Sequence, residues 1–464
     1  MTRNKISEKQ AKDWEKFYKK NNYYHRTVQK FVRYLIPKHS SVLEFGAKGG
    51  EMLNSLPNTK KCGVSRNKYL IDNRVRGSKI FNYKNYKSKI KGKYDYILLS
   101  NFLNDEKDVQ MFVNKTKTLC GDKSRYVVFG FNYLWKPLLD LLEKFNLKLP
   151  TYKEQNWLSK GDIDNFFQLE GFENIKDGRI ILLPINIPLI SNLVNRYIAP
   201  LPIFNWFCFA SYGIYREKKT VEKDYSVSII IPARNESGHM KGIFKKVPHF
   251  TDNIEIVFVE GGSSDDTFQV IKDEIKNNKS QFTASLHKQR GKGKGDAVRL
   301  GFSKAKNDIF MILDADLTVD PKELPKFYKV IASRMADFVM GSRLIYPMES
   351  EAMRNLNVLG NKIFSIAFSF LLDSRIKDTL CGTKVLFRSD YNLIRKNRSY
   401  FGDFDPFGDY DLIFGASKLN LKILEIPIRY KNREYGETNI SRFTHGWLLM
   451  KMVAFAARKL KFVG

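Results

Sequence analysis

Two aspartates that follow an apolar run have the clearest potential for chemistry in this sequence. In "MILDADLTVD", Asp314 and Asp316 come at the end of a predicted buried strand, and ligands bind beyond this end of the strands in open α/β sheets. The i, i+2 spacing places both carboxylates on one side of the chain, where they repel each other unless a cation lies beside them. Mg²⁺ is usually held by one or two carboxylates and by substrate phosphates. The pair therefore predicts a Mg²⁺ or Mn²⁺ site for a diphosphate, with a solvated acidic turn as the plain alternative.

Three other segments of the same half carry groups that suit a nucleotide diphosphate. "IIPARNE" places Ala233, Asn235 and Glu236 just past one predicted strand, and "VEGGSSDDT" places Glu260 at the end of the next. "GKGKGDAVRLGF" is a glycine-rich loop that runs into a helix, so its backbone amides and Lys294 could meet a diphosphate. Each segment is weak alone, but together with the aspartate pair they predict a nucleotide-sugar and metal site.

These motifs, in this order, resemble the family-2 glycosyltransferases of the GT-A fold, most closely the dolichyl-phosphate mannose synthase-like branch. The opening P-x-x-N-E of the family is matched by Pro232, Asn235 and Glu236. Its acidic position for the base and ribose is matched by Glu260. Gly261 stands where the family often has a second aspartate, so the resemblance leaves uridine and guanosine both open.

Later motifs extend the resemblance to about residue 440. The aspartate pair matches the DxD motif of the family, which implies that Asp316, the second aspartate, ligates the metal. Arg343 closes a match to its G-S-R motif. Arg433, Gly436 and Thr438 match its late R-x-x-G-x-[ST] motif.

The resemblance implies inverting transfer of a sugar, with the metal and Lys294 stabilising the leaving nucleoside diphosphate. Two kinds of acceptor stay open. A polyprenyl phosphate is already a nucleophile and needs arginines, for which Arg343, Arg354 and Arg433 are present. A glycan hydroxyl needs a general base, and "FGDFDPFGDYDL" offers Asp409 or Asp411 for it. One of these two aspartates also suits the N-cap of a helix.

The first half of the chain carries a second strand–glycine turn, "VLEFGAKGG". With the alternating strands and helices around it and a late pair of strands, it resembles the class I S-adenosylmethionine-dependent methyltransferases. Glu44, Gly46 and Gly50 match the family's cofactor loop, but Lys48 replaces its middle glycine, which tolerates φ > 0.

Two further cofactor contacts of that family are altered. Ser65 and Arg66 follow the second strand, where the family has an acid for the ribose, and "IFNYKNYKSKI" lacks the acid that contacts adenine. We therefore expect a methyltransferase-like fold that has lost S-adenosylmethionine, and that serves as a scaffold for a partner, the acceptor or the membrane. A bifunctional enzyme that also methylates the glycan is the alternative.

The length of 464 residues and these motifs predict two doubly wound α/β domains, and the alternation of strands and helices in the first half implies a parallel sheet there. We place a methyltransferase-like domain at 1–215, a charged linker at 216–225 and a GT-A glycosyltransferase domain at 226–440. The last segment, 441–464, has apolar residues at helical spacing and basic residues towards its end. It suits a helix that lies on an anionic membrane surface or one that packs on its own domain.

Charge and composition narrow the partners and the compartment. The net charge of +30 favours anionic partners, but no RNA-binding motif or basic cluster with interleaved aromatics is present, so nucleic acid is not expected. Four scattered cysteines and an N-terminus without an apolar signal core predict a cytoplasmic protein, peripheral at the inner membrane face. The apolar segment 179–213 is broken by four prolines and Arg196, so it could touch a membrane but is poorly built to cross one.

Overall fold

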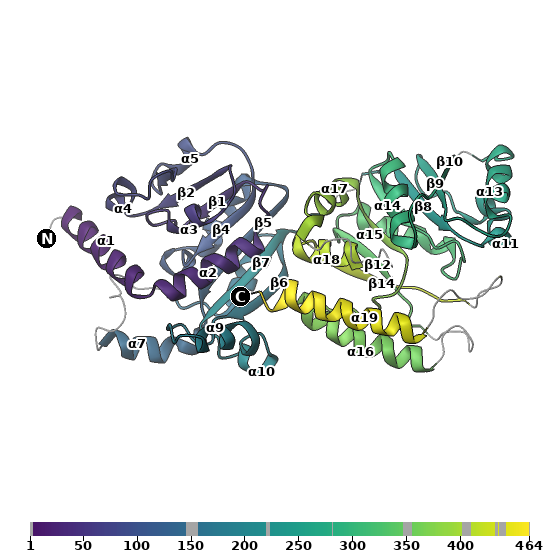
Figure 1. Cartoon of the computed structure of the whole chain (residues 1–464). Helices are drawn as coiled ribbons and strands as arrows, with labels where there is room; N and C mark the ends of the chain where they lie inside the picture. Colours follow the sequence, from purple (N-terminus) through teal and green to yellow (C-terminus); the bar gives the residue numbers. More distant parts are fainter. Residues whose placement is uncertain are drawn as a thin grey trace. The chain divides into compact units, whose positions relative to one another are not determined.

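The computed structural model describes residues 3–144, 156–219, 223–280, 282–346, 355–400, 410–431, 435 and 442–463. The chain divides into two compact units (Figure 1). The first contains Met1–Lys218 with Phe462–Gly464, and the second contains Lys219–Lys461. Each unit is a layered α/β structure built on its own sheet.

Within the described part of the first unit, seven strands form one sheet in the order β3-β2-β1-β4-β5-β7-β6. The strands are β1 Val42–Phe45, β2 Lys61–Ser65, β3 Ile80–Asn82, β4 Tyr94–Ser100, β5 Cys120–Phe131, β6 Phe172–Ile180 and β7 Ala210–Glu217. Strands β1 to β5 pair in parallel, whereas β7 runs antiparallel to both β5 and β6. The predicted late pair of strands is thus confirmed, and β7 includes the first two residues of the segment expected to be a linker.

Apolar side chains cover both faces of this sheet. Along β4, Ile97 and Leu99 join one apolar cluster, while Tyr96 and Leu98 join another. This alternation is the two-residue period of a strand that is buried on both faces. The helices of the unit are α1 Arg3–Lys20, α2 Asn22–Leu35, α3 Glu51–Ser55, α4 Lys68–Asp72, α5 Tyr86–Lys89, α6 Val109–Thr116, α7 Lys136–Lys144, α8 Lys160–Leu169, α9 Ile190–Leu193 and α10 Pro202–Asn205.

The described part of the second unit also contains a seven-stranded sheet, in the order β10-β9-β8-β11-β13-β12-β14. Its strands are β8 Val227–Ala233, β9 Ile254–Glu260, β10 Thr283–Lys288, β11 Ile309–Ile312, β12 Phe338–Ser342, β13 Lys384–Phe387 and β14 Ile423–Pro427. Strands β8 to β11 are parallel, but β13 is antiparallel to β11 and β12. The parallel sheet expected from the alternating strands and helices of the first half is confirmed in β1 to β5, whereas the antiparallel β7 and β13 make both sheets mixed.

Helices complete the described part of the second unit. They are α11 Ser237–Met240, α12 Ile243–Lys246, α13 Thr267–Lys276, α14 Lys294–Lys304, α15 Leu324–Ala332, α16 Asn355–Leu372, α17 Arg388–Lys396, α18 Tyr410–Lys418 and α19 Arg442–Ala456. Helices α16 and α19 lie side by side (Figure 1). Leu449 and Met452 of α19 are buried in the same cluster as Phe368 of α16, whereas Trp447 and Met450 are exposed. Among the described residues, no helix combines the length and apolarity that a membrane span requires.

Helix α14 is held close to the sheet by a glycine. A Cβ placed on Gly301 would lie 2.5 Å from Cγ2 of Ile230, a fully buried residue of β8. This close approach fixes the helix whose first residue is Lys294.

We expect Gly301→Ala to lower the melting temperature. Alanine gains about 1 kcal/mol of helix propensity, but inserting a methyl group against a packed core costs about 1–3 kcal/mol. The control is Gly360→Ala in α16, where a Cβ would meet no described atom within 4 Å. That variant should unfold at the same or a higher temperature in calorimetry, and equal stabilisation of both variants would contradict the packing of α14.

Candidate functional site

The candidate site of the second unit begins at the carboxyl end of β11. Leu317 donates its backbone N–H to the carbonyl of Asp314 at 3.1 Å and closes a tight turn. Leu317 has φ of +49°, which is uncommon for a residue other than glycine. Within the turn, Oδ1 of Asp316 accepts hydrogen bonds from the backbone N–H of Thr318 at 3.2 Å and from its hydroxyl at 2.9 Å. The turn therefore holds both aspartates of the DxD motif in defined positions.

Asp314 lies among three cationic side chains. Nζ of Lys294 is 2.7 Å from Oδ1 of Asp314. Burial by itself would raise the pKa of Asp314, but Lys294, together with Lys384 and Arg343, lowers it below its ordinary value. Asp314 is therefore a carboxylate that anchors Lys294, the first residue of α14.

A glycine allows the loop before β13 to reach this ion pair. A Cβ on Gly382 would lie 1.9 Å from Oδ2 of Asp314 and 2.5 Å from Nζ of Lys294, so a larger residue here would displace the ion pair. Lys384, which follows in β13, is fully buried and donates to the carbonyl of Cys381. Neither Gly382 nor Lys384 belongs to a motif that the sequence predicts to be part of the site. Their only local signal is "DTLCGTKVLF", where a charge and a glycine directly precede a short apolar run.

The carboxylates present fit a divalent cation that takes most of its ligands from a diphosphate. Among the described residues, no group of three or more histidine, cysteine, aspartate or glutamate side chains could hold a metal by itself. Mg²⁺ commonly uses one or two carboxylates plus phosphates and water. Because Asp314 already faces Lys294, Asp316 is the better candidate to hold the metal.

The loops after β8 and β9 are tied to each other by hydrogen bonds. Asn235 has φ of +58°, a conformation that asparagine tolerates better than most residues. Its backbone N–H donates to the hydroxyl of Ser263 at 3.0 Å, and its side-chain oxygen accepts from the backbone N–H of Ser264 at 2.8 Å. Ala233, the last residue of β8, accepts from the N–H of Gly261 at 2.9 Å. These contacts order the edge of the sheet at which a nucleotide would bind.

The acidic residues of these loops, Glu236 and Glu260, make contacts with groups of the same chain. The carboxylate of Glu236 lies 2.8 Å from Nδ1 of His239, and its backbone N–H donates to the hydroxyl of Thr267 at 2.8 Å. Glu260 is buried and accepts from the backbone N–H of Ser263. Pro232 lies one residue before the end of β8 and pairs with Val259 of β9. The structure thus brings these predicted residues together, with Glu236 and Glu260 shaping the loops.

Tyr435 connects a late segment of the chain to the same edge. Its hydroxyl is 3.2 Å from the hydroxyl of Ser237, and its ring meets that of His239 edge-on at 5.7 Å. A Cβ on Gly238 would lie 2.6 Å from the tyrosine ring, so glycine makes this contact possible. Tyr435 belongs to the predicted R-x-x-G-x-[ST] motif, whose members Arg433, Gly436 and Thr438 lie outside the described residues.

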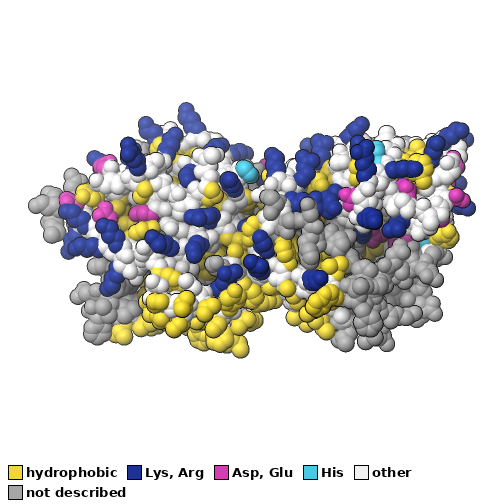
Figure 2. Space-filling model, viewed as in Figure 1, with side chains coloured by type: hydrophobic (Ala, Val, Ile, Leu, Met, Phe, Trp, Pro, Cys, Tyr) yellow, Lys and Arg dark blue, Asp and Glu magenta, His cyan; other side chains and the backbone are white. Residues whose placement is uncertain are grey.

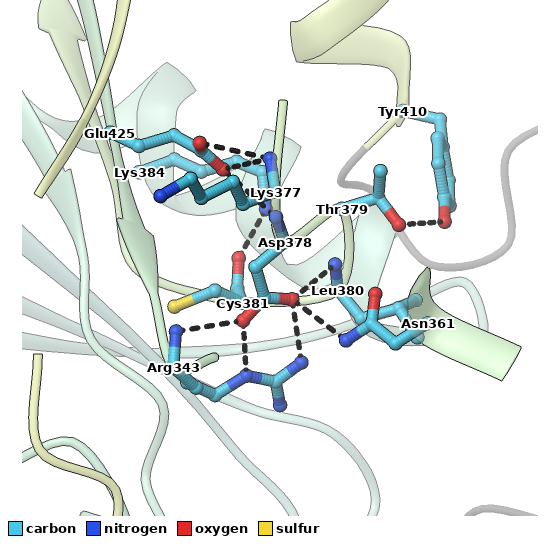
Figure 3. Close-up of polar contacts among 10 residues, drawn as sticks. All are labelled: Arg343, Asn361, Lys377, Asp378, Thr379, Leu380, Cys381, Lys384, Tyr410 and Glu425. Carbon is cyan, nitrogen blue, oxygen red and sulfur yellow. Dashed lines mark hydrogen bonds and ion pairs between the residues drawn. The ribbon is translucent and has the colours of Figure 1, made fainter. Parts of the chain in front are cut away.

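Arg343, a predicted acceptor-phosphate ligand, makes a bidentate ion pair with Asp378 (Figure 3). Its Nε and one terminal nitrogen donate to the two carboxylate oxygens at 2.7 and 2.8 Å. The side chain of Asn361 and the backbone N–H of Leu380 donate to the same carboxylate at 3.1 Å each. Burial would raise the pKa of Asp378, but Arg343 lowers it to about 2. The guanidinium therefore fixes the loop that precedes β13.

Of the remaining predicted site residues of this unit, Asp411 is described and the others lie outside the described residues. Asp411 is in the first turn of α18, where a carboxylate interacts favourably with the helix dipole. It is paired with Arg398 at 3.0 Å. Asp409 and Arg354 lie outside the described residues, as Arg433 does.

In the first unit, the glycine turn has positive φ at several positions, and Gly49 and Lys48 contact side chains of the same chain. Gly46, Lys48 and Gly50 all have positive φ, and Lys48 reaches +50°. The ammonium of Lys48 lies 5.3 Å from the centre of the Trp14 ring. Glu51 accepts from the backbone N–H of Gly49 at 3.1 Å and from the indole of Trp14 at 3.3 Å. A loop amide that could face a cofactor therefore donates to Glu51.

Arg66, which is exposed, packs against two aromatic rings that follow β3 and β4. Its guanidinium lies 4.7 Å from the ring of Tyr83 and 4.2 Å from the ring of Phe102. It donates to the carbonyl of Asp105 at 2.6 Å and forms an ion pair with Glu106. The resemblance places the nucleoside of S-adenosylmethionine at these strand ends, where Arg66 makes these contacts instead of an acidic residue.

Glu44 at the end of β1 is buried with an unsatisfied atom. Its Oε2 has no hydrogen-bond partner among the described residues. Burial raises the pKa of this carboxyl to about 8. The first unit therefore carries a carboxylic acid that is largely protonated at neutral pH.

Part of the second unit matches the model of a known protein family. The model of "Glycosyl transferase family 2" matches residues 228–395. The low-salt glycan biosynthesis hexosyltransferase Agl6 of Haloferax volcanii is 27% identical over 226 residues, which are 48% of this chain and 51% of that protein. The dolichol-phosphate mannosyltransferase of Pyrococcus furiosus is 28% identical over 251 residues, 51% of this chain and 67% of that protein.

Among solved structures, glucosyl-3-phosphoglycerate synthase from Mycobacterium tuberculosis aligns with a TM-score of 0.38 and 15% identity. The alignment covers 51% of this chain and 80% of that one. The chain spans about half the length of the Haloferax relative. From the family match, the C-terminal half of this chain contains a domain of glycosyltransferase family 2.

Proposed function

We propose that this protein transfers a hexose from a nucleotide-diphosphate sugar to a polyprenyl phosphate, with Mg²⁺ or Mn²⁺ as cofactor. The observation that carries the proposal is the ion pair of Lys294 and Asp314 beside Asp316, at the carboxyl end of β11. It lies within the segment that matches glycosyltransferase family 2. The name of the Pyrococcus furiosus relative, dolichol-phosphate mannosyltransferase, specifies a polyprenyl phosphate.

The residues of the site divide the work of binding and stabilising the donor. Lys294 has three N–H donors, so it can keep its contact with Asp314 and still donate to a phosphate oxygen. As the bond to the sugar breaks, charge develops on the diphosphate, and a fixed ammonium stabilises that charge. A divalent cation held by Asp316 would neutralise more of the same charge. Asn235 orders the loops against which the base and ribose would lie.

We choose a phosphate acceptor because of the ion pairs that Asp411 and Arg343 make within the chain. A phosphate acceptor needs no general base, because it is already ionised. Asp411 is paired with Arg398, so acting as a base for a hydroxyl acceptor would require this ion pair to break. Arg343 is committed to Asp378, so we propose that it positions the loop before β13. Arg354 and Arg433 then remain as the phosphate ligands, with Asp409 as the base if the acceptor is instead a glycan hydroxyl.

The membrane would present such an acceptor. Helix α19 packs one side against α16 while Trp447 and Met450 stay exposed, and Lys451 follows them. Aromatic and basic side chains on one helix favour binding to an anionic membrane surface. We propose that the second unit works at such a surface.

Asp316→Asn should abolish metal-dependent transfer. The purified full chain is incubated with labelled UDP- and GDP-sugars, Mn²⁺ and undecaprenyl phosphate, and labelled lipid is extracted. Because one transition-state contact to developing charge is worth about 100-fold or more in rate, we expect at least that loss. Asp308→Asn, at the opposite and exposed end of the same strand, should retain transfer.

Two results would overturn parts of this proposal. Full activity of the Asp316 variant would remove the metal role of this residue. Transfer to a sugar hydroxyl, with none to the lipid phosphate, would replace the acceptor.

For the first unit we propose a methyltransferase-like fold that does not bind S-adenosylmethionine. The strand order β3-β2-β1-β4-β5-β7-β6 and the late antiparallel pair support the fold. The placement of Arg66 between Tyr83 and Phe102 supports the loss of the cofactor. We favour a scaffold role over a second, methylating activity.

Calorimetry with S-adenosylmethionine tests this directly. At roughly 1 mM ligand, which detects even weak binding, the natural chain should give no heat of binding. The triple variant Lys48→Gly, Ser65→Asp, Arg66→Ala empties the space between the two rings and restores the family's residues. It should bind measurably, and micromolar binding by the unmodified chain would refute the proposal.

Glu44 should make the first unit more stable in acid than in alkali. Its folded-state pKa of about 8 lies above the ordinary 4.5, so the folded state holds a proton that the unfolded state has released. The contribution of this residue is fully present below about pH 4.5 and is lost as the pH rises through about 8. Glu44→Gln should therefore raise the denaturation midpoint at about pH 9 and have little effect at about pH 4. Asp72→Asn, at an exposed carboxylate of α4, controls for the lost charge, and an equal change in both variants would contradict the burial argument.

A further inference from the structure

The first unit carries an unusual concentration of exposed apolar side chains on α9, α10 and the turns around them. Figure 2 shows them gathered over these helices, bordered by lysines and arginines. The side chains concerned are all large and hydrophobic: Ile185, Ile187, Leu189, Ile190, Leu193, Tyr197, Leu201, Ile203, Phe204, Trp206 and Phe207. Large exposed apolar patches on a folded protein mark sites of interaction with a protein or a membrane. We call this surface, residues 185–207, the apolar shelf.

The shelf extends onto the residues just after β5. Trp135 donates its indole N–H to the carbonyl of Phe207 at 3.0 Å, which places the start of α7 against the shelf. Tyr133 and Leu134, immediately before it, are also exposed. Two segments more than fifty residues apart in sequence therefore contribute to one surface.

The shelf is built from ordered backbone rather than from a loosely packed loop. Asn195 accepts at Oδ1 from the backbone N–H groups of Leu182 and Leu183, at 2.8 and 2.9 Å. Asn205 donates to the carbonyl oxygens of Arg179 and Ala199 at 2.7 and 3.1 Å. The asparagines that interrupt the apolar run thus satisfy backbone groups from within. That is the requirement for a backbone that enters a region poor in water.

Several side chains stand out from the shelf instead of lining a hollow. Leu189 is 81% exposed, Ile203 75% and Trp206 70%. Leu189 has φ of +64° and ψ of −47°, and the N–H of Ile190 donates to the carbonyl of Pro188 at 2.7 Å. This is a γ-turn of the rare, strained kind, and it projects the leucine outward. Protein interfaces place their strongest contacts in packed, complementary pockets, whereas a fluid bilayer accommodates protruding side chains.

The charge pattern indicates which kind of membrane fits. No aspartate or glutamate occurs from residue 178 to 216, and of the three arginines there Arg179 and Arg196 are partly exposed, whereas Arg216 is buried and paired with Glu173. Tyr23 of α2 donates to Asn192 at the edge of the shelf, and Lys19 and Lys20 lie just before it at the end of α1. Basic residues next to a membrane surface are attracted to anionic lipids, and Trp and Tyr favour the headgroup level.

We infer that the apolar shelf, with Tyr133 and Leu134, inserts into the headgroup region of an anionic bilayer and holds the first unit on the membrane. The helices α9 and α10 are one turn long, so they enter one leaflet and do not cross it. The inference does not rest on sugar transfer, and it assigns to the first unit a binding role that needs no cofactor.

A single labelled cysteine tests the contact. The four natural cysteines are all buried, so a thiol-reactive, environment-sensitive fluorophore can be directed to Ile203→Cys. With phosphatidylglycerol-rich vesicles, the emission should shift to the blue and intensify several-fold, while pure phosphatidylcholine should give a smaller change. The matched control is Leu169→Cys on α8, 59% exposed on the same unit, which should not respond. No response at position 203 to any vesicle would refute the inference.

Vesicle sedimentation provides the second measurement. The variant Leu189→Ser, Ile203→Ser, Trp206→Ser removes exposed apolar surface without touching the core, so it should fold as the natural chain does. We expect its partition onto anionic vesicles to fall by about tenfold or more. The control Val75→Ser, Met111→Ser, Leu169→Ser, at exposed positions elsewhere on the unit, should partition normally. Equal partition of the two triple variants would contradict the inference.

A second copy of the chain is the competing occupant. In that case the fluorophore would respond to rising protein concentration without vesicles, and light scattering would show a dimer that the serine variant does not form. That outcome would overturn membrane insertion. Donor binding is followed in the same samples by thermal shift with nucleotide sugars and Mn²⁺. Insertion without donor binding would support the membrane-binding role of the apolar shelf and contradict the proposed transferase function.

Discussion

The ion pair between Asp314 and Lys294 is the contact on which the candidate site depends. It joins the turn after β11 to the first residue of α14, and the loop before β13 closes over it at Gly382. Burial alone would raise the pKa of Asp314, but Lys294, with Lys384 and Arg343, lowers it. The elements around it must therefore keep their spacing, because an unpaired charge here would cost several kcal/mol. Gly301, at the other end of α14, serves the same spacing from the side of the sheet.

A second ion pair holds the loop before β13, which also contains Gly382. Arg343 at the end of β12 and Asp378 satisfy each other almost completely, with Asn361 and Leu380 completing the bonds to the carboxylate. Glu425 of β14 accepts the backbone N–H groups of Lys377 and Asp378, at 2.8 and 2.9 Å. Loop, strand and helix are thus connected by charge-assisted bonds, which are the stronger kind. The site is positioned by buried electrostatics in the half of the sheet where the strand directions change.

Local sequence patterns predicted much of this architecture. The apolar runs before Asn235, Glu260 and Asp314 are strands, and the polar residues after them meet at one edge because β8, β9 and β11 are parallel neighbours. The glycine turn of the first unit has the positive φ values expected of it, including the left-handed Lys48. These features depend on residues close in sequence, where strand period and glycine geometry leave few choices.

Contacts between distant segments could not be predicted in this way. The antiparallel β13, the approach of Gly382 to Asp314 and the pairing of Arg343 with Asp378 each join residues more than thirty positions apart. Nothing local distinguishes an arginine that will bind a carboxylate of its own chain from one that will bind a phosphate, since both ligands suit the same fork of donors. Arg66 is a similar case, because its stacking partners follow two other strands.

The packing of Arg66 also bears on how the first unit responds to its surroundings. A protein whose cleft receives a ligand gains stability in proportion to the logarithm of the ligand concentration. Here the Arg66 guanidinium packs on two rings of the same chain, and Glu51 accepts a hydrogen bond from a loop amide. These contacts form within the chain as it folds, so the stability that they contribute does not depend on the concentration of a small molecule.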